Sequence, residues 1–324
     1  MLKNVYGIDV GNYDTKSALE STSSAYTTSR TQPVWEKEYL QYNDMYYIPS
    51  NSRSAFEKDK TTRDKELILA LISIGKETLA RLEKNNITET EQIQEAISKI
   101  KHINLGVGLP PRYMSKEKTC QTMDYYKEKM GKGIQFEYTG YSFSFDLQSV
   151  QVFPQGLLPS LFLAPDSVKR YGKYYGIDIG GYTVDVIFIV DGKSDFEKTV
   201  TIEKGVLPLY EKIIDKVMIE QGVTLEPLLI EDVLMQREHI LDDEIVAIVN
   251  DCTVSWVDEI INTLTQKGVN LKTYPSCWSG GGSLLFRPHI DTSSKVAKQH
   301  SYIEDVNANA KCYQNYIQAT HKQK

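Results

Sequence analysis

The sequence predicts an α/β protein of two related domains, and three observations carry this prediction. The stretch VYGIDVGNYDTK at residues 5–16 returns as YYGIDIGGYTVD at residues 174–185, with six of eleven positions identical from Tyr6 and Tyr175 onward. Strand and helix patterns follow each copy. The chain of 324 residues also exceeds what one hydrophobic core usually holds. We therefore interpret the repeat as two copies of the start of a domain.

Each copy reads as a strand, a tight glycine turn and a second strand. In the first copy, residues 5–10 form an apolar run, a Gly-Asn pair follows, and a second strand is predicted over residues 15–19. When the copies are aligned on their glycines, Lys16 of the first stands at the position of Asp185 in the second. The two hairpins are therefore expected to share a backbone path and to differ in charge.

Helix and strand patterns continue through the first domain. Apolar residues recur at helical spacing from Asp64, the predicted N-cap, and again after Thr88 or Thr90 as the cap of a second helix. Residues 103–111, INLGVGLPP, predict a buried strand that ends in a turn. The aromatic and β-branched stretch 134–156 is typical of further strands.

A domain boundary is predicted in segment 164–173, which is polar and contains Pro and Gly. Domain I is then residues 1–163, joined by the C-terminal segment 301–324, and domain II is residues 164–300. Helical spacing dominates the middle of domain II. Near its end, NLKTYPSCWSGGGSLLF at residues 270–286 predicts a short strand, a triple-glycine turn and the start of a helix.

The two Asp-x-Gly hairpins suit the binding of a polyphosphate with a metal ion. A tight turn built on glycine points backbone N–H groups into a small concavity that binds anions. Because like charges repel, Asp9 and Asp178 are expected to hold Mg²⁺ through water rather than to contact phosphate. Lys16 can reach a phosphate as a point charge, whereas Asp185 can reach the waters of the metal or an attacking water.

The run SGGGS at residues 279–283 adds a third element. Three glycines before an apolar run let the backbone pass close to a flat or charged ligand at the start of a helix. An ordinary flexible turn is the other interpretation. Because two phosphate-binding hairpins accompany this run, we expect it to contact the ligand.

These motifs resemble those of a known superfamily. Asp9-x-Gly11, the run from Asp178 to Asp185 and Ser279 to Gly282 resemble the phosphate 1, phosphate 2 and adenosine motifs of the actin, hexokinase and heat-shock-chaperone ATPases. The resemblance implies an actin-like (ribonuclease H-like) α/β fold, with two related domains and the nucleotide cleft between them.

Three weaker features resemble one branch of that superfamily, the ParM-type plasmid-segregation actins and their archaeal relatives. They are GVGLPPRYM at residues 106–114, QVFPQGLLP at 151–159 and DVNANAKC at 305–312. The last keeps the Ala-Asn-Ala of the family signature but has Cys312 where glycine is usual. The implied cofactors are ATP, or GTP, and Mg²⁺, with Asp9 and Asp178 holding the metal through water.

The resemblance further implies which residues bind the nucleotide. These are Gly11, Asn12, Tyr13, Asp14, Thr15 and Lys16 of the first hairpin; Gly180, Gly181, Tyr182 and Thr183 of the second; Lys204 and Gly205; and Gly280, Gly281, Gly282 and Ser283.

The catalytic residues implied are Gln155, Asp185 and Asp178. ParM-like proteins usually have Glu where this chain has Gln155, and conventional actins have Gln. An amide cannot take a proton from water, so Gln155 would orient the attacking water as the glutamine of GTPases does. The role of general base would then fall to Asp185 or to the phosphate itself. A structural role at the hinge between the domains is the alternative for Gln155.

The function implied is that of a filament-forming, nucleotide-hydrolysing ATPase that segregates plasmid DNA. A ParR-like adaptor would bind the centromere and the filament, so contact with DNA would be indirect, which fits the net charge of −6. The Tyr and Met side chains of residues 43–47 and 110–114 are candidate filament contacts, with packing inside the domain as the other interpretation. A small-molecule kinase for a sugar or an acid, on the same superfamily fold, is the alternative function.

A soluble, cytoplasmic protein is expected. The chain enters a strand pattern directly, without a signal segment, and no apolar run approaches the roughly 20 residues that a membrane span needs. The polar residues 51–63 are expected to form a solvated loop.

Overall fold

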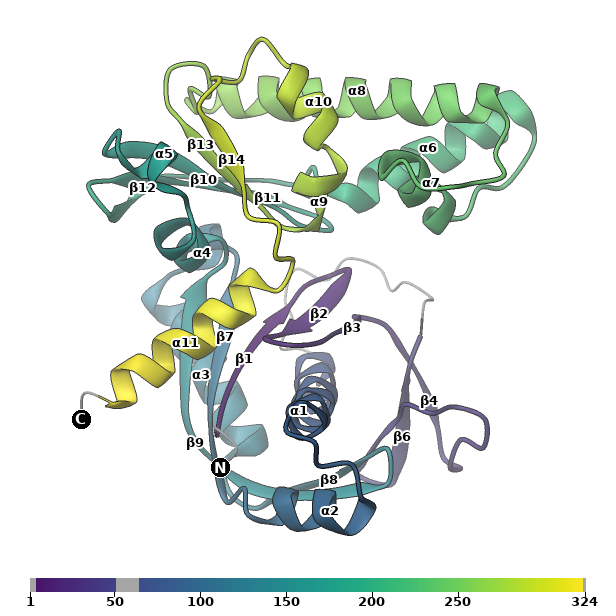
Figure 1. Ribbon diagram of the computed structural model, residues 1–324, viewed down its shortest axis with the longest axis vertical. Coiled ribbons are helices and arrows are strands. Elements are labelled where there is room, and N and C mark those ends of the chain that lie inside the picture. The colour runs from purple at the N-terminus through teal and green to yellow at the C-terminus, as the bar shows by residue number, and fades with distance from the viewer. Residues whose placement is uncertain (1–3, 51–63, 323–324) are drawn as a thin grey trace. The chain divides into compact units, whose positions relative to one another are not determined.

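The computed structural model describes residues 4–50 and 64–322, and the chain divides into two compact units (Figure 1). Unit 1 consists of Met1–Gln155 and Asn307–Lys324, and unit 2 of Gly156–Val306. Each unit therefore contains one copy of the repeat. The domain limits at 163/164 and 300/301 stay predictions, and the loop expected over residues 51–63 lies outside the described part of the chain.

In unit 1 the described strands form one sheet with the order β3-β2-β1-β7-β9-β8-β5-β6-β4. The strands are β1 (Val5–Val10), β2 (Asp14–Ser17), β3 (Ser21–Ser23), β4 (Tyr26–Ser29), β5 (Leu40–Tyr42), β6 (Met45–Pro49), β7 (His102–Leu109), β8 (Ile134–Tyr138) and β9 (Tyr141–Pro154). In unit 2 the order is β12-β11-β10-β13-β14. These strands are β10 (Lys173–Ile179), β11 (Val184–Val190), β12 (Lys193–Ile202), β13 (Ser276–Ser279) and β14 (His300–Tyr302).

The two sheets share one five-strand plan. In unit 1, β1 pairs antiparallel with β2 and parallel with β7, while β2 pairs antiparallel with β3 and β7 pairs parallel with β9. In unit 2, β10, β11, β12, β13 and β14 repeat the same four pairings in the same order. The α/β class and the duplication of a domain start are therefore confirmed.

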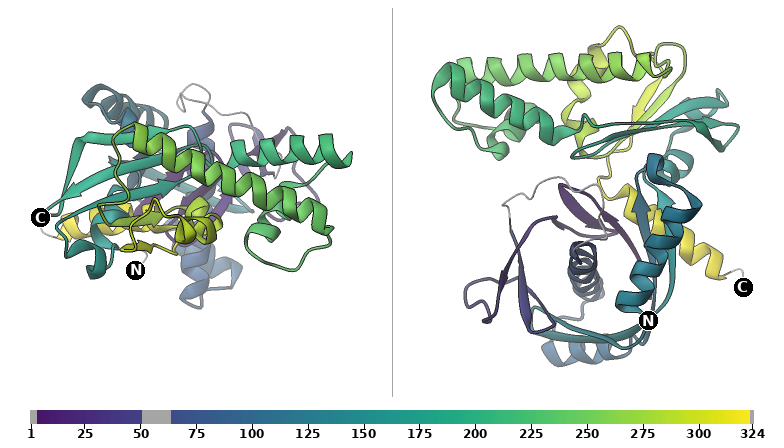
Figure 2. Two further views of the ribbon diagram at one scale, coloured as in Figure 1. Left: turned by 90° about the horizontal axis from the view of Figure 1, so that it is seen from above. Right: turned by 180° about the vertical axis from the view of Figure 1, so that it is seen from behind.

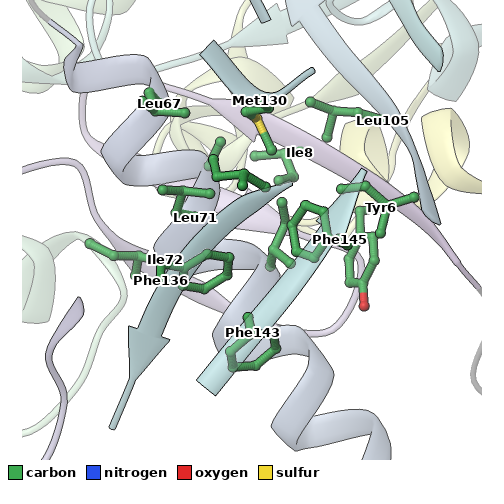
Figure 3. Close-up of a cluster of buried hydrophobic side chains, with 14 of the residues drawn as sticks. Tyr6, Ile8, Leu67, Leu71, Ile72, Leu105, Met130, Phe136, Phe143 and Phe145 are labelled. Carbon is green, nitrogen blue, oxygen red and sulfur yellow. The ribbon is translucent and has the colours of Figure 1, made fainter. Parts of the chain in front are cut away.

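Helix α1 (Lys65–Lys84) forms the centre of the unit 1 core. Its residues 66–75 are all buried, which a helix packed on one face only would not allow. Figure 1 shows the sheet of unit 1 curving around this helix. Figure 3 shows the side chains that α1 contributes lying among those of β1, β7, β8, β9 and α3 (Lys116–Met130); labelled are Tyr6, Ile8, Leu67, Leu71, Ile72, Leu105, Met130, Phe136, Phe143 and Phe145.

One predicted cap position is confirmed and one is wrong. Asp64 occupies the N-cap position of α1, but its backbone is left-handed (φ 52°) and its side chain makes no capping hydrogen bond. Its carboxylate instead lies 2.9 Å from Lys129 Nζ of α3, so a tertiary ion pair replaces the local cap. Helix α2 (Thr90–Ser98) is preceded by Glu89, and neither Thr88 nor Thr90 occupies the N-cap position.

In the middle of unit 2, α6 (Val206–Gln221), α7 (Pro227–Leu234) and α8 (Asp243–Gln266) follow the predicted helical spacing, and α9 (Gly281–Leu285) begins at the predicted triple-glycine turn. The other described helices are η1 (Pro111–Tyr113) and α11 (Ala308–Lys322) in unit 1, and α4 (Leu157–Phe162), α5 (Asp166–Lys169) and α10 (Arg287–Thr292) in unit 2. The sequence patterns predict none of η1, α4, α5 and α10, and α5 lies in the segment expected to be a polar domain boundary. Helices α6 and α8 pack side by side (Figure 2). Within the ranges described, none of the helices has the length and apolar character required to cross a membrane.

The first strand of each unit is covered by a helix that approaches it at a glycine. A Cβ atom on Gly7 of β1 would overlap the backbone oxygen of Ala310 in α11. A Cβ atom on Gly176, the equivalent residue of β10, would overlap the side chain of Ser160 in α4. The shared glycine of the repeat therefore has a packing reason that recurs in both units.

A buried ion pair ties three elements of unit 1 together. Glu77 and Arg81 of α1 lie one turn apart and form a salt bridge in the core. Arg81 Nη2 also donates hydrogen bonds to the carbonyl oxygen of Val5 (2.8 Å) and to Gln314 Oε1 of α11 (2.6 Å). Glu77 Oε2 accepts the backbone N–H of Ala18 (2.9 Å), just after β2. Helix α1 thus fixes the hairpin and α11 relative to one another.

Gly7→Ala should lower the free energy of unfolding by about 2 kcal/mol or more, because the new methyl group meets backbone that cannot rotate away. Gly281→Ala is the matched control, since a Cβ atom there has no other atom within 4 Å. Urea denaturation of both variants, followed by circular dichroism, gives the comparison. Equal midpoints for the two variants would contradict the packing role of Gly7.

Candidate functional site

The turn of the first hairpin is closed by the backbone of Gly11. Its N–H donates to the carbonyl oxygens of Asp9 and Asp14, both at 3.1 Å, and a Cβ atom would lie 2.5 Å from the oxygen of Asp14. The turn is also fixed by Ser24, whose Oγ donates to Gly11 O (2.6 Å) and whose N–H donates to Tyr13 O (3.0 Å). A glycine is required at position 11 because the chain closes on itself there.

Asp9 lies at the end of β1 and is only 8% exposed. Its Oδ1 accepts a hydrogen bond from Gln155 Nε2 (2.5 Å), and its Oδ2 accepts one from Asn309 Nδ2 (3.1 Å). Three segments remote in sequence, β1, the residue after β9 and the first turn of α11, therefore meet at one carboxylate. The predicted residues Asp9 and Gln155 are brought together.

Asn309 is a site residue that the sequence interpretation did not assign. It lies in the DVNANAKC run at residues 305–312, whose resemblance to the family signature is weak. The signal that could have found it is the Asn between two alanines. Ala308 and Ala310 are both buried, and small neighbours allow an amide to come close to a strand.

The second hairpin is attached to the start of α6. Gly180 N–H donates to Thr183 O (2.9 Å), as Gly11 N–H does to Asp14 O. The N–H groups of residues 205–207 donate to the carbonyl oxygens of residues 180–182 at 2.8–3.2 Å. A Cβ atom on Gly205 would lie 2.5 Å from the carbonyl group of Gly181. The predicted residue Gly205 therefore holds the turn in place.

Asp178 and Asp185 face each other across the second hairpin, as Asp9 and Lys16 do across the first. Asp185 is 4% exposed, and its carboxylate accepts hydrogen bonds from Thr183 Oγ1 (3.0 Å) and Thr201 Oγ1 (2.5 Å). The equivalent positions of the repeat are thus a half-buried lysine in unit 1 and a buried carboxylate bound by hydroxyl groups in unit 2.

Two glycines with positive φ lie against Asp178. Gly156 (φ 75°) would place a Cβ atom 3.1 Å from the Cβ of Asp178, and Gly280 (φ 83°) would place one on its Oδ1. The SGGGS run is thereby brought to the second hairpin. Gly281 is open on the Cβ side, and Ser283 is buried with its hydroxyl donating to Gly280 O (2.8 Å).

Lys204 lies in a cluster between α6 and α8. Its Nζ is 2.8 Å from Glu259 Oε2 and 4.4 Å from the centre of the Trp256 ring. Hydrogen bonding to Lys204 lowers the pKa of Glu259. The indole N–H of Trp256 donates to the carbonyl oxygen of Gly205 (3.2 Å), so this cluster supports the segment that carries the second turn.

Several predicted residues of the two hairpins are half-buried: Asn12, Tyr13, Asp14 and Lys16 in the first, and Gly181, Tyr182 and Thr183 in the second. In the described ranges, no group of three or more His, Cys, Asp or Glu side chains is placed to hold a metal ion. Any metal at these hairpins would take most of its ligands from water or from a bound phosphate.

Comparison with known proteins places the fold. A scan of protein-family models and a search of curated proteins gave no match. Among solved structures, an archaeal actin homologue has 17% identity and a TM-score of 0.72, covering 98% of this chain and 100% of that one. ParM in a 15-stranded filament from Clostridium botulinum has 14% identity and a TM-score of 0.71, with the same coverage. ParM of Bacillus thuringiensis with ATP has 11% identity and a TM-score of 0.61, covering 99% and 100%.

The chain therefore has the two-domain, actin-like α/β fold that the sequence predicted. The likeness extends over nearly the whole of each chain.

Thr201→Val should destabilise unit 2 by about 1–3 kcal/mol, because the buried Asp185 carboxylate loses a hydrogen-bond donor. Thr201→Ser keeps the hydroxyl and should retain most of the stability. Thermal unfolding of the two variants distinguishes the hydrogen bond from the methyl group. Equal losses in both variants would show that packing, and not the hydroxyl, matters at this position.

Proposed function

We propose that this protein is a filament-forming, actin-like ATPase that segregates plasmid DNA in the manner of ParM. The observation that carries the proposal is the pair of Asp-x-Gly hairpins, each with a buried carboxylate and a closed glycine turn, on an actin-like fold. A duplicated fold alone would not require both hairpins to keep these features.

In this proposal each of the two turns binds nucleotide phosphate. The first contributes Gly11 to Thr15 and Lys16, and the second contributes Gly180 to Thr183. Gly280 to Ser283 contact the adenosine, together with Lys204 and Gly205. The archaeal actin homologue has been solved with ADP and Bacillus thuringiensis ParM with ATP, which favours ATP as the substrate over GTP.

Mg²⁺ fits the chemistry of these residues. Asp9 and Asp178 are single buried carboxylates next to glycine turns, and Mg²⁺ typically binds one or two carboxylates, several waters and substrate phosphates. When bound, the ion neutralises charge on the transferred phosphate. Asp9 and Asp178 would hold its waters and orient them.

Hydrolysis would depend on Gln155. Its Nε2 donates a hydrogen bond to Asp9, so its Oε1 is the atom that can accept a hydrogen bond from the attacking water. The carboxylate oxygens of Asp185 accept hydrogen bonds from the hydroxyl groups of Thr183 and Thr201. Asp185 would therefore orient the Thr183 hydroxyl group and a water molecule beyond it. Because the Gln155 amide orients the attacking water but cannot take its proton, that proton would pass to Asp185 or to the phosphate itself.

Gln155→Ala should leave ATP binding within a few-fold of wild type and slow hydrolysis roughly 100-fold, because the attacking water loses its orientation. Gln151→Ala, on the same strand, is the matched control and should leave both unchanged. Phosphate release and equilibrium binding of a fluorescent ATP analogue give the two quantities. Unchanged turnover in Gln155→Ala would remove this residue from the mechanism.

Self-association is supported by other chains of this fold, which have been solved as filaments. The tyrosines of residues 43–47 are half-buried, and Tyr46 and Tyr47 pack against Tyr39 and Tyr26, which favours the interpretation of local packing for them. Trp35, in the loop between β4 and β5, is instead 92% exposed beside Val34 at 82%. Such exposed apolar side chains are typical of protein contacts.

Plasmid segregation would need a DNA-binding partner. The net charge of −6 argues against a strong hold on DNA phosphates by this chain alone. A ParR-like adaptor that binds the centromere and the filament would supply the contact, in the cytoplasm where plasmid DNA lies.

Purified protein with ATP and Mg²⁺ should assemble, measured as increased light scattering and as protein in the pellet after centrifugation. GTP in place of ATP tests the nucleotide preference. Trp35→Ser should raise the critical concentration at least about tenfold, since an exposed aromatic anchor contributes 1.4 kcal/mol or more at contacts of this kind, and should leave ATP binding unchanged.

The absence of assembly over a wide range of concentrations would contradict the filament proposal. Transfer of phosphate from ATP to a sugar or an acid in that case would establish the kinase instead.

A further inference from the structure

The carboxylate of Asp9 is held by two neutral amide groups, one on each oxygen. Gln155 Nε2 lies 2.5 Å from Oδ1 and Asn309 Nδ2 lies 3.1 Å from Oδ2. We propose that Asn309 is a positioning residue of the nucleotide site: with Gln155 it fixes the Asp9 carboxylate, and Asp9 in turn fixes the Gln155 amide with its carbonyl oxygen outward. The inference rests on the proposed hydrolysis, which it deepens.

The orientation of Gln155 follows from the chemistry of its partner. An ionised carboxylate only accepts hydrogen bonds, so the amide must turn its NH₂ group toward Asp9 and its Oε1 away. Within the described part of the chain, Oε1 receives no hydrogen bond. If the Asp9 carboxylate could turn away from Gln155, the amide could present either its Oε1 or its Nε2 to water. A carboxylate held at its second oxygen by Asn309 removes that freedom.

Neutral donors are the appropriate partners for a carboxylate that acts on a cation. A lysine or arginine at position 309 would form an ion pair with Asp9 and cancel the charge that attracts a metal ion with its waters. A neutral amide orients the carboxylate through hydrogen bonds and leaves its negative charge uncompensated. Each carboxylate oxygen has a second lone pair that remains able to accept from water.

Helix α11 places Asn309 against Asp9 by close packing. Ala310, the next residue, lies on Gly7, and Tyr313, one turn further on, stacks on Phe153 with ring centres 5.0 Å apart. Phe153 precedes Gln155 by two residues on the same chain segment. One helix therefore supports both amide donors, one directly and one through an aromatic contact.

The test uses Asn309→Asp and Asn309→Leu, with Asn315→Asp as the matched control. Asn315 is on the exposed side of the same helix, so its replacement changes the charge of α11 in the same way without reaching Asp9. In Asn309→Asp two carboxylates face each other, and like charge favours one shared proton. At low pH the protonated Asp at position 309 can donate to Asp9, and this donor is lost as the pH rises.

Two measurements follow. Without nucleotide, the melting temperature of Asn309→Asp relative to Asn315→Asp should fall as the pH rises from 5 to 8, because the folded state binds the extra proton and the unfolded state does not. With ATP, kcat should fall at least about tenfold at pH 8 in Asn309→Asp and Asn309→Leu with KM within about threefold. Lowering the pH should restore kcat toward that of the control in the Asp variant only.

The outcomes separate the inference from the proposed function. If the wild type hydrolyses ATP and both position-309 variants keep its kcat, the inference is overturned and the proposed ATPase activity is retained. A flat melting profile for Asn309→Asp, parallel to that of Asn315→Asp, would show that the contact with Asp9 is not made. An inactive wild type with the expected pH-dependent melting would sustain the contact and contradict the ATPase.

Discussion

The structure depends on the missing side chain at one position of the repeated strand. At Gly7 and at Gly176 a helix lies so close to the strand that a Cβ atom would overlap the backbone of Ala310 or the side chain of Ser160. Each of these strands is the central strand of the shared five-strand plan and ends in the Asp-x-Gly turn. The glycine therefore decides how near a second segment can come to the aspartate two residues further along the chain.

That closeness gives each aspartate its surroundings. In unit 1 the covering helix α11 begins beside Asp9, and its first turn supplies the Asn309 amide. In unit 2 the covering helix α4 begins after Gly156, which lies against Asp178. Equivalent strands with the same glycine thus bring a side-chain amide to Asp9 and a glycine backbone to Asp178. The duplicated backbone allows two different chemical environments.

The parts of the fold that the sequence predicted are those specified locally. The hairpins follow from apolar runs on either side of a glycine turn, and α1 follows from apolar residues that recur at helical spacing after Asp64. The contact of Asp9 with Asn309 joins residues 300 positions apart, and that of Asp185 with Thr201 joins separate strands, so periodicity could not show either. Asp64 occupies the N-cap position, but its carboxylate forms an ion pair with Lys129 of another helix, a partner that no local pattern shows.

The difference between the two hairpins is more informative than their likeness. Asp9 is bound by amides and stands opposite Lys16, so the first hairpin combines an oriented carboxylate with a lysine on the neighbouring strand. Asp178 stands opposite a second carboxylate, Asp185, which two hydroxyl groups hold in the interior. A lysine attracts phosphate, whereas a buried pair of acids attracts a hydrated cation or polarises water. Divergence at this one cross-strand position is therefore sufficient to give two copies of the same glycine turn opposite charges beside their aspartates.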